Sequence, residues 1–290
     1  MARDFRVGPS APIFTLWFGL VRYGSLVARY RNAPLKYVLF VAELGSVSIL
    51  SEREALDAIH TAIKSELPVR EDLNDAVLAR PDGTLSRSGG ARFVDGAQHR
   101  AVLVVPSRIS VDTTMYTSFT EFVAFLDRVL GAVAQVAPGR ACRRLGLRYI
   151  DEIRVPGVTP GDVSQWRGWI DDALFPPVVE RTSAGERDIS GALDERREDG
   201  FGVRFTWHTG NGHLVDPEGP LIVPNPSDPS PYFALDTDSY WDARPGSEVL
   251  GLGDPALLER IRALHDPVEE YFEMSLTDRL RNEILQPVKT

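Results

Sequence analysis

The segment from Tyr116 to Val155 constrains the fold most, because it joins a long amphipathic helix to a strand of mixed character. Ser118 and Glu121 form a capping-box pattern, in which each side chain satisfies an amide at the start of a helix. Behind them, apolar residues recur at helical spacing: Phe122, Phe125, Leu126, Val129, Leu130, Val133 and Val136. The pair Pro138-Gly139 ends this pattern. We therefore predict a helix that begins after Ser118 and ends before Pro138.

The strand predicted at residues 143–153 carries apolar side chains on one face and arginines on the other. Because side chains alternate along a strand, Leu145, Leu147 and Tyr149 share the face on which the helix would pack. Arg144 and Arg148 lie on the opposite face, on either side of a glycine that lets another group approach the backbone. That face is either the floor of a ligand site or a solvated surface, and charged residues on the outer face of a strand are ordinary.

Charge and cysteine content limit the class of protein. The chain has 290 residues and a net charge of −9, which argues against nucleic-acid binding because that function needs a basic face. A single cysteine, Cys142, excludes a disulfide framework and is typical of a reducing compartment. We expect a cytoplasmic protein, and the sequence sets no oligomeric state.

Residues 1–32 form an N-terminal arm that differs from the rest of the chain. Its apolar run, Ile13 to Val21, lies between basic residues and is too short to span a bilayer, which needs about 20 apolar residues. The arm is either a partner-binding or membrane-surface segment, or a poorly ordered sequence ahead of the domain. We favour the second interpretation, because termini outside a core are usually loosely held. We expect no membrane contact.

The remaining patterns predict an α+β protein. They indicate, in order, a strand at 36–44, a helix at 51–67 opened by a Ser51–Glu54 capping box, antiparallel strands within 76–115, a helix at 159–174, a charged loop or insertion at 180–200, strands at 203–209 and 232–240, and helical stripes at 257–272 and after Ser275. Six prolines at 216–231 indicate an irregular, surface-exposed connection. We predict antiparallel sheets with helices packed mainly on one face, in two loosely similar halves, 33–156 and 157–290.

Four strings of residues are also informative together: Pro-Leu-Lys-Tyr-Val-Leu-Phe at 34–40, Tyr-Thr-Ser-Phe-Thr-Glu-Phe at 116–122, Arg-Leu-Gly-Leu-Arg-Tyr-Ile at 144–150 and Phe-Glu-Met-Ser-Leu-Thr-Asp-Arg-Leu at 272–280. In these the chain resembles a sporadically distributed family of uncharacterised bacterial proteins, over about residues 33–286. The Arg-x-Gly-Leu-Arg-Tyr-Ile string is the most specific. Family members often have Asn where this chain has Asp151. The resemblance implies that the domain begins near Ala33, and it transfers no activity.

Two histidines raise the question of a metal. His208 and His213 flank Gly210-Asn211-Gly212, with Asp216 beyond, and two histidines with a carboxylate can bind a transition metal. However, Gly-Asn-Gly is a turn signal that needs no metal. We predict no metal and no cofactor.

Asp236 and Asp238 share one face of their predicted strand, where two like charges need a cation, an arginine or water. Arg144 and Arg148 are natural partners for them. We predict that at least one of these arginines meets an Asp or Glu side chain. For His265, which precedes Pro267 by two residues, helix capping or surface exposure is favoured over catalysis.

No phosphate loop, nucleophile elbow or His-Glu-x-x-His motif is present. The leading hypothesis is a cytoplasmic binding or accessory protein that contacts a protein partner or a small anionic ligand. The alternative is an enzyme that holds a small anionic substrate with Arg144 and Arg148, with Tyr149, Tyr116 or His265 as acid or base. The candidate ligand- or partner-binding residues are Tyr116, Arg144, Arg148, Tyr149, Asp236, Asp238 and His265.

Overall fold

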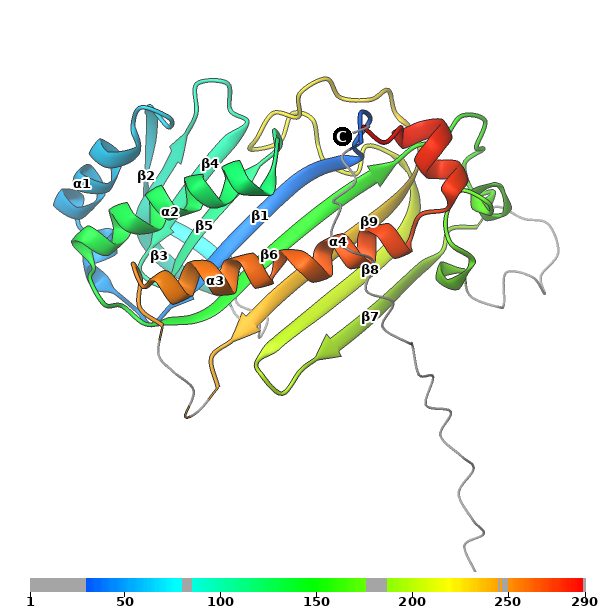
Figure 1. Cartoon of the computed structure of the whole chain (residues 1–290). Helices are drawn as coiled ribbons and strands as arrows, with labels where there is room; N and C mark the ends of the chain where they lie inside the picture. Colours follow the sequence, from blue (N-terminus) through cyan, green and yellow to red (C-terminus); the bar gives the residue numbers. More distant parts are fainter. Residues whose placement is uncertain (1–29, 80–84, 176–186, 245, 247–249, 289–290) are drawn as a thin grey trace, which may run out of the picture.

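The computed structural model describes residues 30–79, 85–175, 187–244, 246 and 250–288. Its frame is one nine-stranded sheet with the order β2-β3-β4-β5-β1-β6-β9-β8-β7, in which neighbouring strands are antiparallel (Figure 1). The strands are β1 (Leu35–Leu44), β2 (Val69–Ala79), β3 (Leu85–Val94), β4 (Arg100–Val105), β5 (Arg108–Thr113), β6 (Cys142–Ile153), β7 (Ser190–Arg196), β8 (Phe201–Gly212) and β9 (Ser230–Asp242). The α+β class is confirmed, with one sheet where the sequence allowed several.

Each half of the chain follows the same route through this sheet if the boundary is placed between α2 and β6, earlier than the boundary after residue 156 that the sequence suggested. Each half starts on a central strand, crosses to an edge, returns strand by strand to the centre and ends in a helix. The first half runs from β1 through η1 (Ser48–Ser51), α1 (Arg53–Ile63) and β2–β5 to α2 (Phe119–Val136). The second runs from β6 through η2 (Val163–Trp166), η3 (Asp172–Leu174) and β7–β9 to α3 (Pro255–Ala263) and α4 (His265–Met274), followed by a π-helical segment, η5 (Leu280–Leu285).

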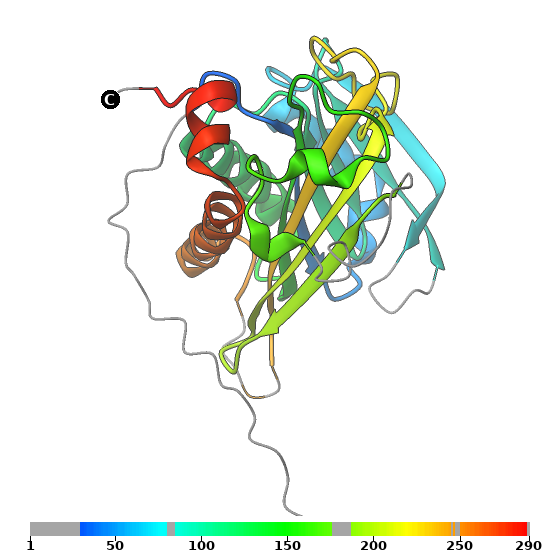
Figure 2. The same ribbon diagram turned by 90° about the vertical axis from the view of Figure 1, so that its right-hand side faces the viewer.

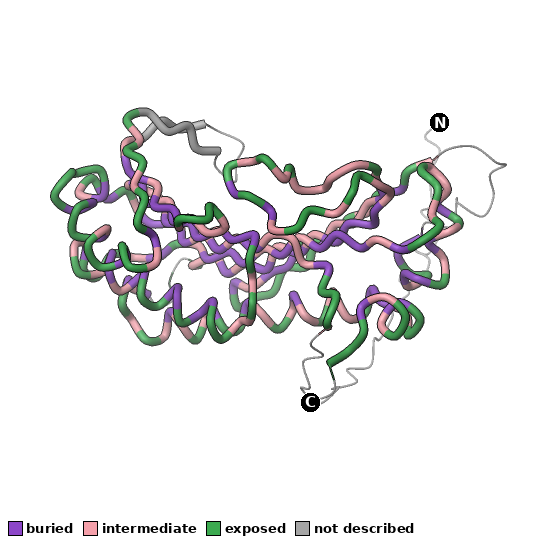
Figure 3. The backbone as a smooth tube through the Cα atoms, turned by 90° about the horizontal axis from the view of Figure 1, so that it is seen from above, coloured by how far each residue is buried: buried purple, intermediate pink, exposed green. Residues whose placement is uncertain are grey.

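The helices lie on one face of the sheet (Figure 2). Between them and the sheet lies the larger hydrophobic core, where Phe40, Phe93, Phe125 and Leu147 are fully buried. A second core in the other half is closed by Trp166 and Ile170 of the segment around η2. Buried stretches follow the sheet, whereas the surrounding loops are largely exposed (Figure 3). The opposite, helix-free face is therefore the one available for polar side chains.

Of the two predicted capping boxes, the one at the start of α2 is confirmed and the one at the start of α1 is wrong. The Ser118 hydroxyl accepts a hydrogen bond from the Glu121 amide at 3.3 Å, so α2 begins as predicted. At α1 the N-cap is Glu52, without a side-chain hydrogen bond. The Ser51 hydroxyl instead donates to the Ser48 carbonyl at 2.7 Å, because the preceding turn, η1, competes for it.

The predicted helix at 159–174 is wrong, although its apolar stripe is buried. Two short 3₁₀ turns, η2 and η3, replace it, because Gly161 and Gly168 adopt φ of +75° and +82°, outside the helical region. Trp166 and Ile170 are still 2 % and 0 % exposed. Periodicity identified which side chains are buried, whereas the glycines determined the backbone path.

The predicted charged loop at 180–200 is wrong where it is described. Residues 176–186 lie outside the described part of the chain, but β7 forms at Ser190–Arg196 and pairs with β8 at the edge of the sheet. Most of its residues are exposed. An exposed edge strand tolerates charged side chains, and these hide the pattern that would otherwise predict a strand.

The proline-rich connection at 216–231 is irregular up to Pro229, as predicted, and β9 begins at Ser230. It is not simply exposed, because Leu221 and Val223 are 4 % and 6 % exposed. Leu221 packs on Val94 and Ala101, on the helix-free face. The connection is held there by a hydrogen bond of 2.8 Å from the Ile222 amide to the Gln98 carbonyl.

Most of the N-terminal arm, residues 1–29, lies outside the described residues. Its last residues belong to the fold, however. The Tyr30 hydroxyl donates to Glu273 at 2.9 Å, and the Arg31 amide donates to the Gln286 carbonyl at 3.0 Å. The ordered domain thus includes residues ahead of Ala33. No helix among the described residues is both long and apolar enough to cross a membrane.

Two glycine substitutions test the packing around β7 and α2. Gly191 lies against the ring of Trp207, which is fixed by a hydrogen bond of 2.8 Å from Nε1 to the Leu174 carbonyl. We expect Gly191→Ala to lower the free energy of unfolding by about 1–3 kcal/mol, because the added methyl group collides with that ring. Gly131 of α2 has open space around it. Gly131→Ala should stabilise by about 0.5–1 kcal/mol. Urea melts measure both, and similar effects would contradict the assigned packing.

Candidate functional site

The sheet separates the seven candidate residues into two groups on opposite faces. Arg144, Arg148, Asp236 and Asp238 face the helix-free side, where β6 and β9 pair with Arg148 opposite Asp238. Tyr116, Tyr149 and His265 lie on the helix side, in contact with one another. The alternative hypothesis needs both groups around one substrate, and the structure does not bring them together.

Both arginines are paired with carboxylates, so the prediction of at least one such pair is confirmed. Arg148 makes a two-pronged contact with Asp236, from Nε to Oδ1 at 2.7 Å and from Nη2 to Oδ2 at 2.5 Å. Nη1 of Arg144 donates to both oxygens of Asp242 at 2.8 Å. Its guanidinium group also lies 4.2 Å above the ring of Tyr240.

These pairs, with Arg204 and Asp194 on β8 and β7, form a row of charges that we call the charged ladder. Arg204 and Asp194 approach to 4.0 Å and are more than half exposed. The hydrogen bonds to Asp236 raise the pKa of the Arg148 guanidinium further above its ordinary value. An anionic substrate would have to displace a protein carboxylate from either paired arginine, which weakens the case for these residues as substrate holders.

Asp238 is the exception in the ladder. It lies opposite Arg148 on one side and Arg204 on the other. Yet its carboxylate makes no hydrogen bond and no close ion pair with any described residue, because Arg148 turns to Asp236. Burial raises the pKa of Asp238 despite the nearby arginines. A side chain at Gly146 would reach within 3.6 Å of Oδ1, so the glycine leaves space beside this carboxylate.

The helix-side group is a packed cluster of aromatic rings. The Tyr149 hydroxyl donates to that of Tyr116 at 2.7 Å. His265 stacks on Phe119 with ring centroids 3.8 Å apart, and its Nδ1 lies 3.4 Å from Glu269. Burial lowers the pKa of His265 to about 4 and raises that of Glu269 to about 7. The predicted capping or exposed role of His265 is wrong, since Leu264 occupies the N-cap of α4 and only 12 % of the His265 side chain is exposed.

Asp151 lies two residues after Tyr149 on the same, helix-facing side of β6, and it was not among the seven candidate residues. It is 5 % exposed, and its carboxyl group has no hydrogen-bond partner in the described part of the chain. Burial, with a smaller contribution from Asp236, raises the pKa of Asp151 to about 8, so the group is neutral at pH 7. Strand alternation already placed it on the apolar face, and the resembling family often has Asn there.

The prediction of a turn at Gly210-Asn211-Gly212 is wrong, because β8 continues through Gly212 and pairs with β9 as far as Ser230. The ring of Tyr232 lies against Gly210, where a side chain would collide with it, and this close approach explains why residue 210 is a glycine. His208 meets the edge of the same ring at 5.8 Å, and His213 lies beyond the strand end. The described residues include no group of three or more His, Cys, Asp or Glu side chains that could hold a metal.

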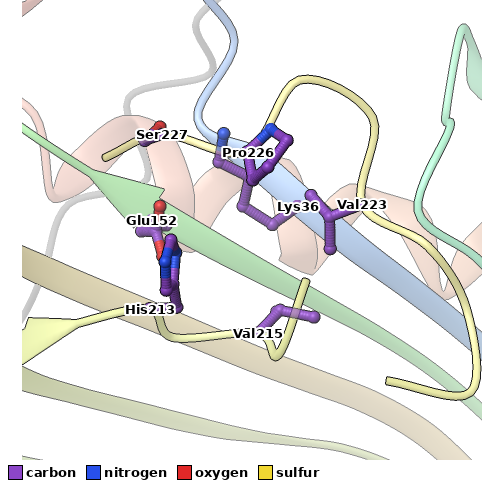
Figure 4. Close-up of a pocket in the computed structure, with 7 residues that line it drawn as sticks. All are labelled: Lys36, Glu152, His213, Val215, Val223, Pro226 and Ser227. Atoms are coloured by element: carbon purple, nitrogen blue, oxygen red, sulfur yellow. The ribbon is translucent and has the colours of Figure 1, made fainter. Parts of the chain in front are cut away.

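His213 instead lines a pocket on the helix-free face that sequence reasoning missed. Its walls are Lys36 of β1, Glu152 of β6, and His213, Val215, Val223, Pro226 and Ser227 of the connection between β8 and β9 (Figure 4). No local motif signals it, because its polar residues come from three distant segments. We call it the Lys36 pocket.

The chain matches no protein-family model, no curated protein and no solved structure. The resemblance to a bacterial family therefore stays a prediction.

Replacing the ladder arginines tests their energetic role. Arg148 is 43 % exposed and Asp236 20 % exposed, so this pair is less buried than a core ion pair. We expect Arg148→Met to destabilise by about 1–3 kcal/mol, because it leaves Asp236 without its two charged donors. Arg204→Met is the matched control and should cost below about 1 kcal/mol, since that arginine is 62 % exposed. Equal losses in denaturant melts would contradict this difference.

The Asp151 carboxyl predicts a pH dependence of stability. The folded protein retains its proton up to about pH 8, whereas an unfolded chain releases it near the ordinary pKa of about 4. Between these values the native state binds more protons, so stability falls as pH rises, by up to about 1.4 kcal/mol per pH unit.

Asp151→Asn carries no such proton and should remove this part of the slope, leaving a protein more stable than the parent at pH 8. Melts across the window measure the effect. Asp127→Asn, on the exposed side of α2, should leave the slope unchanged. A parental slope in Asp151→Asn would show that Asp151 ionises normally in the fold.

Proposed function

We propose that this is a binding protein that recognises a basic segment of a partner protein on the helix-free face, with Asp238 as the anchoring carboxylate. The observation that carries the proposal is the missing donor at Asp238. A partly buried carboxylate without a donor is costly to keep, and such groups are usually satisfied by protein, water or a ligand. A lysine or arginine from a partner would supply the missing hydrogen bonds.

The surrounding charges favour a cationic group at this position. The charged ladder contains three arginines (Arg144, Arg148, Arg204) and four aspartates (Asp194, Asp236, Asp238, Asp242), so one negative charge is left over. The whole chain carries −9, which adds long-range attraction for a basic partner. Gly146 supplies space for the incoming side chain next to Oδ1 of Asp238.

Binding fits this face better than catalysis does. The ladder contains arginine and aspartate side chains but no histidine, cysteine or serine that would pair as nucleophile and base. The acid–base residues of the alternative hypothesis lie on the other face, where ring stacking fills the space between them. We further propose a cytoplasmic location, which is supported by the single, buried and reduced Cys142.

Binding of defined peptides tests the proposal. Fluorescence anisotropy is measured with an arginine-containing peptide and a glutamate-containing peptide of equal length, at physiological ionic strength. We expect the arginine peptide to bind the parent and Asp127→Asn equally, and Asp238→Asn at least about tenfold more weakly, because the anchoring charge is removed. Equal affinity of the arginine peptide for Asp238→Asn and the parent, or no preference between the two peptides, would refute the proposal.

A further inference from the structure

The Lys36 pocket contains a charged group that the binding of a basic partner does not use. Lys36 is only partly exposed and makes no hydrogen bond or ion pair with any described residue. In Figure 4 its side chain extends toward Pro226 and Ser227, while Glu152 and His213 lie side by side across the pocket. An ammonium group held in a walled pocket without a paired anion has hydrogen-bond donors free to bind a negatively charged ligand.

The backbone directs Lys36 into this position. The pairing of β1 with β6 is irregular at this point: Leu35 pairs with Asp151 and Tyr37 pairs with Ile150, so β1 has one more residue than β6 between these pairs. Lys36 is the extra residue of this bulge. A bulge breaks the alternation of side chains and re-aims one of them, and bulges are frequent beside binding sites. Counted back from Val38, which is buried in the helix-side core, regular alternation would place Lys36 on the helix side as well.

The carboxylate of Glu152 does not neutralise Lys36, because its oxygens are already engaged. Nε of Arg154 donates to Oε1 at 2.9 Å, and the Leu214 amide donates to Oε2 at 2.8 Å. Arg154 also donates to the Gly212 carbonyl at 2.5 Å and to the Ser230 hydroxyl at 2.7 Å. Glu152 and Arg154 thus form a fixed pair that ties both ends of the connection to β6 and leaves the charge of Lys36 unbalanced.

The connection that walls the pocket is held in place before any ligand arrives. Its six prolines restrict the backbone. The Thr114 hydroxyl donates to the Ile222 carbonyl at 2.5 Å, and Arg92 donates to the Pro220 carbonyl at 2.7 Å. A pre-ordered wall lowers the entropy lost on binding, which matters most for a small ligand with few contacts.

We propose that the Lys36 pocket binds an oxyanion group, a phosphate or a carboxylate, of a small ligand. Lys36 supplies the charge, and the His213 ring and the Ser227 hydroxyl supply further hydrogen bonds, with Val215 and Val223 as the apolar wall. The pocket is shallow, with an enclosed volume of about 10 Å³, which is room for about one water molecule. An oxyanion would therefore insert one oxygen beside Lys36 and leave the rest of the ligand outside the pocket.

The probes are inorganic phosphate and acetate, titrated into the ¹⁵N-labelled full chain at constant ionic strength, with chloride as the balancing anion. We expect saturable amide shifts at Leu214, Val215 and Ser227 with at least one probe. The probe that binds more tightly identifies the group as phosphate or carboxylate. Lys36→Met should weaken that affinity at least about tenfold, whereas Lys64→Met, on the exposed end of α1, should leave it unchanged.

Lys36→Arg and Ser227→Ala complete the test, because they leave the bulge and the Glu152–Arg154 pair intact. Lys36→Arg should retain binding and Ser227→Ala should weaken it. Absence of saturable shifts with both probes in the parent protein would overturn the proposal, as would equal affinity of Lys36→Met and the parent. The Asp238→Asn variant should bind the probes normally, so failure here is distinguishable from failure of the basic-partner proposal.

Discussion

The antiparallel pairing of β1 with β6 is the interaction on which the rest of the structure depends. It is the only contact within the sheet between the two halves of the chain that are described, and it runs from Leu35–Asp151 to Leu44–Cys142. Because side chains alternate, its register sends Phe40 and Leu147 to the helices and Arg148 to the opposite face. A slip by one residue would turn arginines into the core, so burial of the apolar face holds the register.

The same register creates the polar chemistry of the helix-free face. Arginines on β6 meet carboxylates on β9 and satisfy one another, which stabilises the face without producing an anion site. The carboxylate of Asp238 and the ammonium of Lys36 are among the groups on this face that make no hydrogen bond or ion pair with a described residue. They have opposite charges and lie in different surroundings, one in an open ladder and one in a walled pocket. The two proposals, recognition of a basic partner and capture of a small anion, therefore concern separate positions on one surface.

On the helix side, burial displaces the ionisation of three groups. Asp151, His265 and Glu269 all have pKa values displaced mainly by burial, as active-site residues often do. Here, however, His265 packs against the rings of Phe119 and Tyr149, and Tyr149 in turn contacts Tyr116. The cluster joins α2, α4 and β6, and its consequence is a pH-dependent stability.

The sequence by itself determined the elements whose causes are local. The helix after Ser118, the two faces of β6 and the run of antiparallel strands before it follow from capping and from side-chain periods of about 3.6 and 2 residues. Even the prediction that at least one of Arg144 and Arg148 meets a carboxylate followed from charge on a strand face, and it is confirmed.

Only the tertiary structure decided which residues share a site. Gly161 and Gly168 broke a helix that periodicity favoured, β9 kept β8 extended through Gly212, and the charges of β7 concealed an edge strand. The bulge at Lys36 and the missing donor at Asp238 depend on neighbours far along the chain. Such contacts have no local pattern, because a pairing register and a hydrogen-bond partner are properties of two segments, and each segment alone is compatible with several.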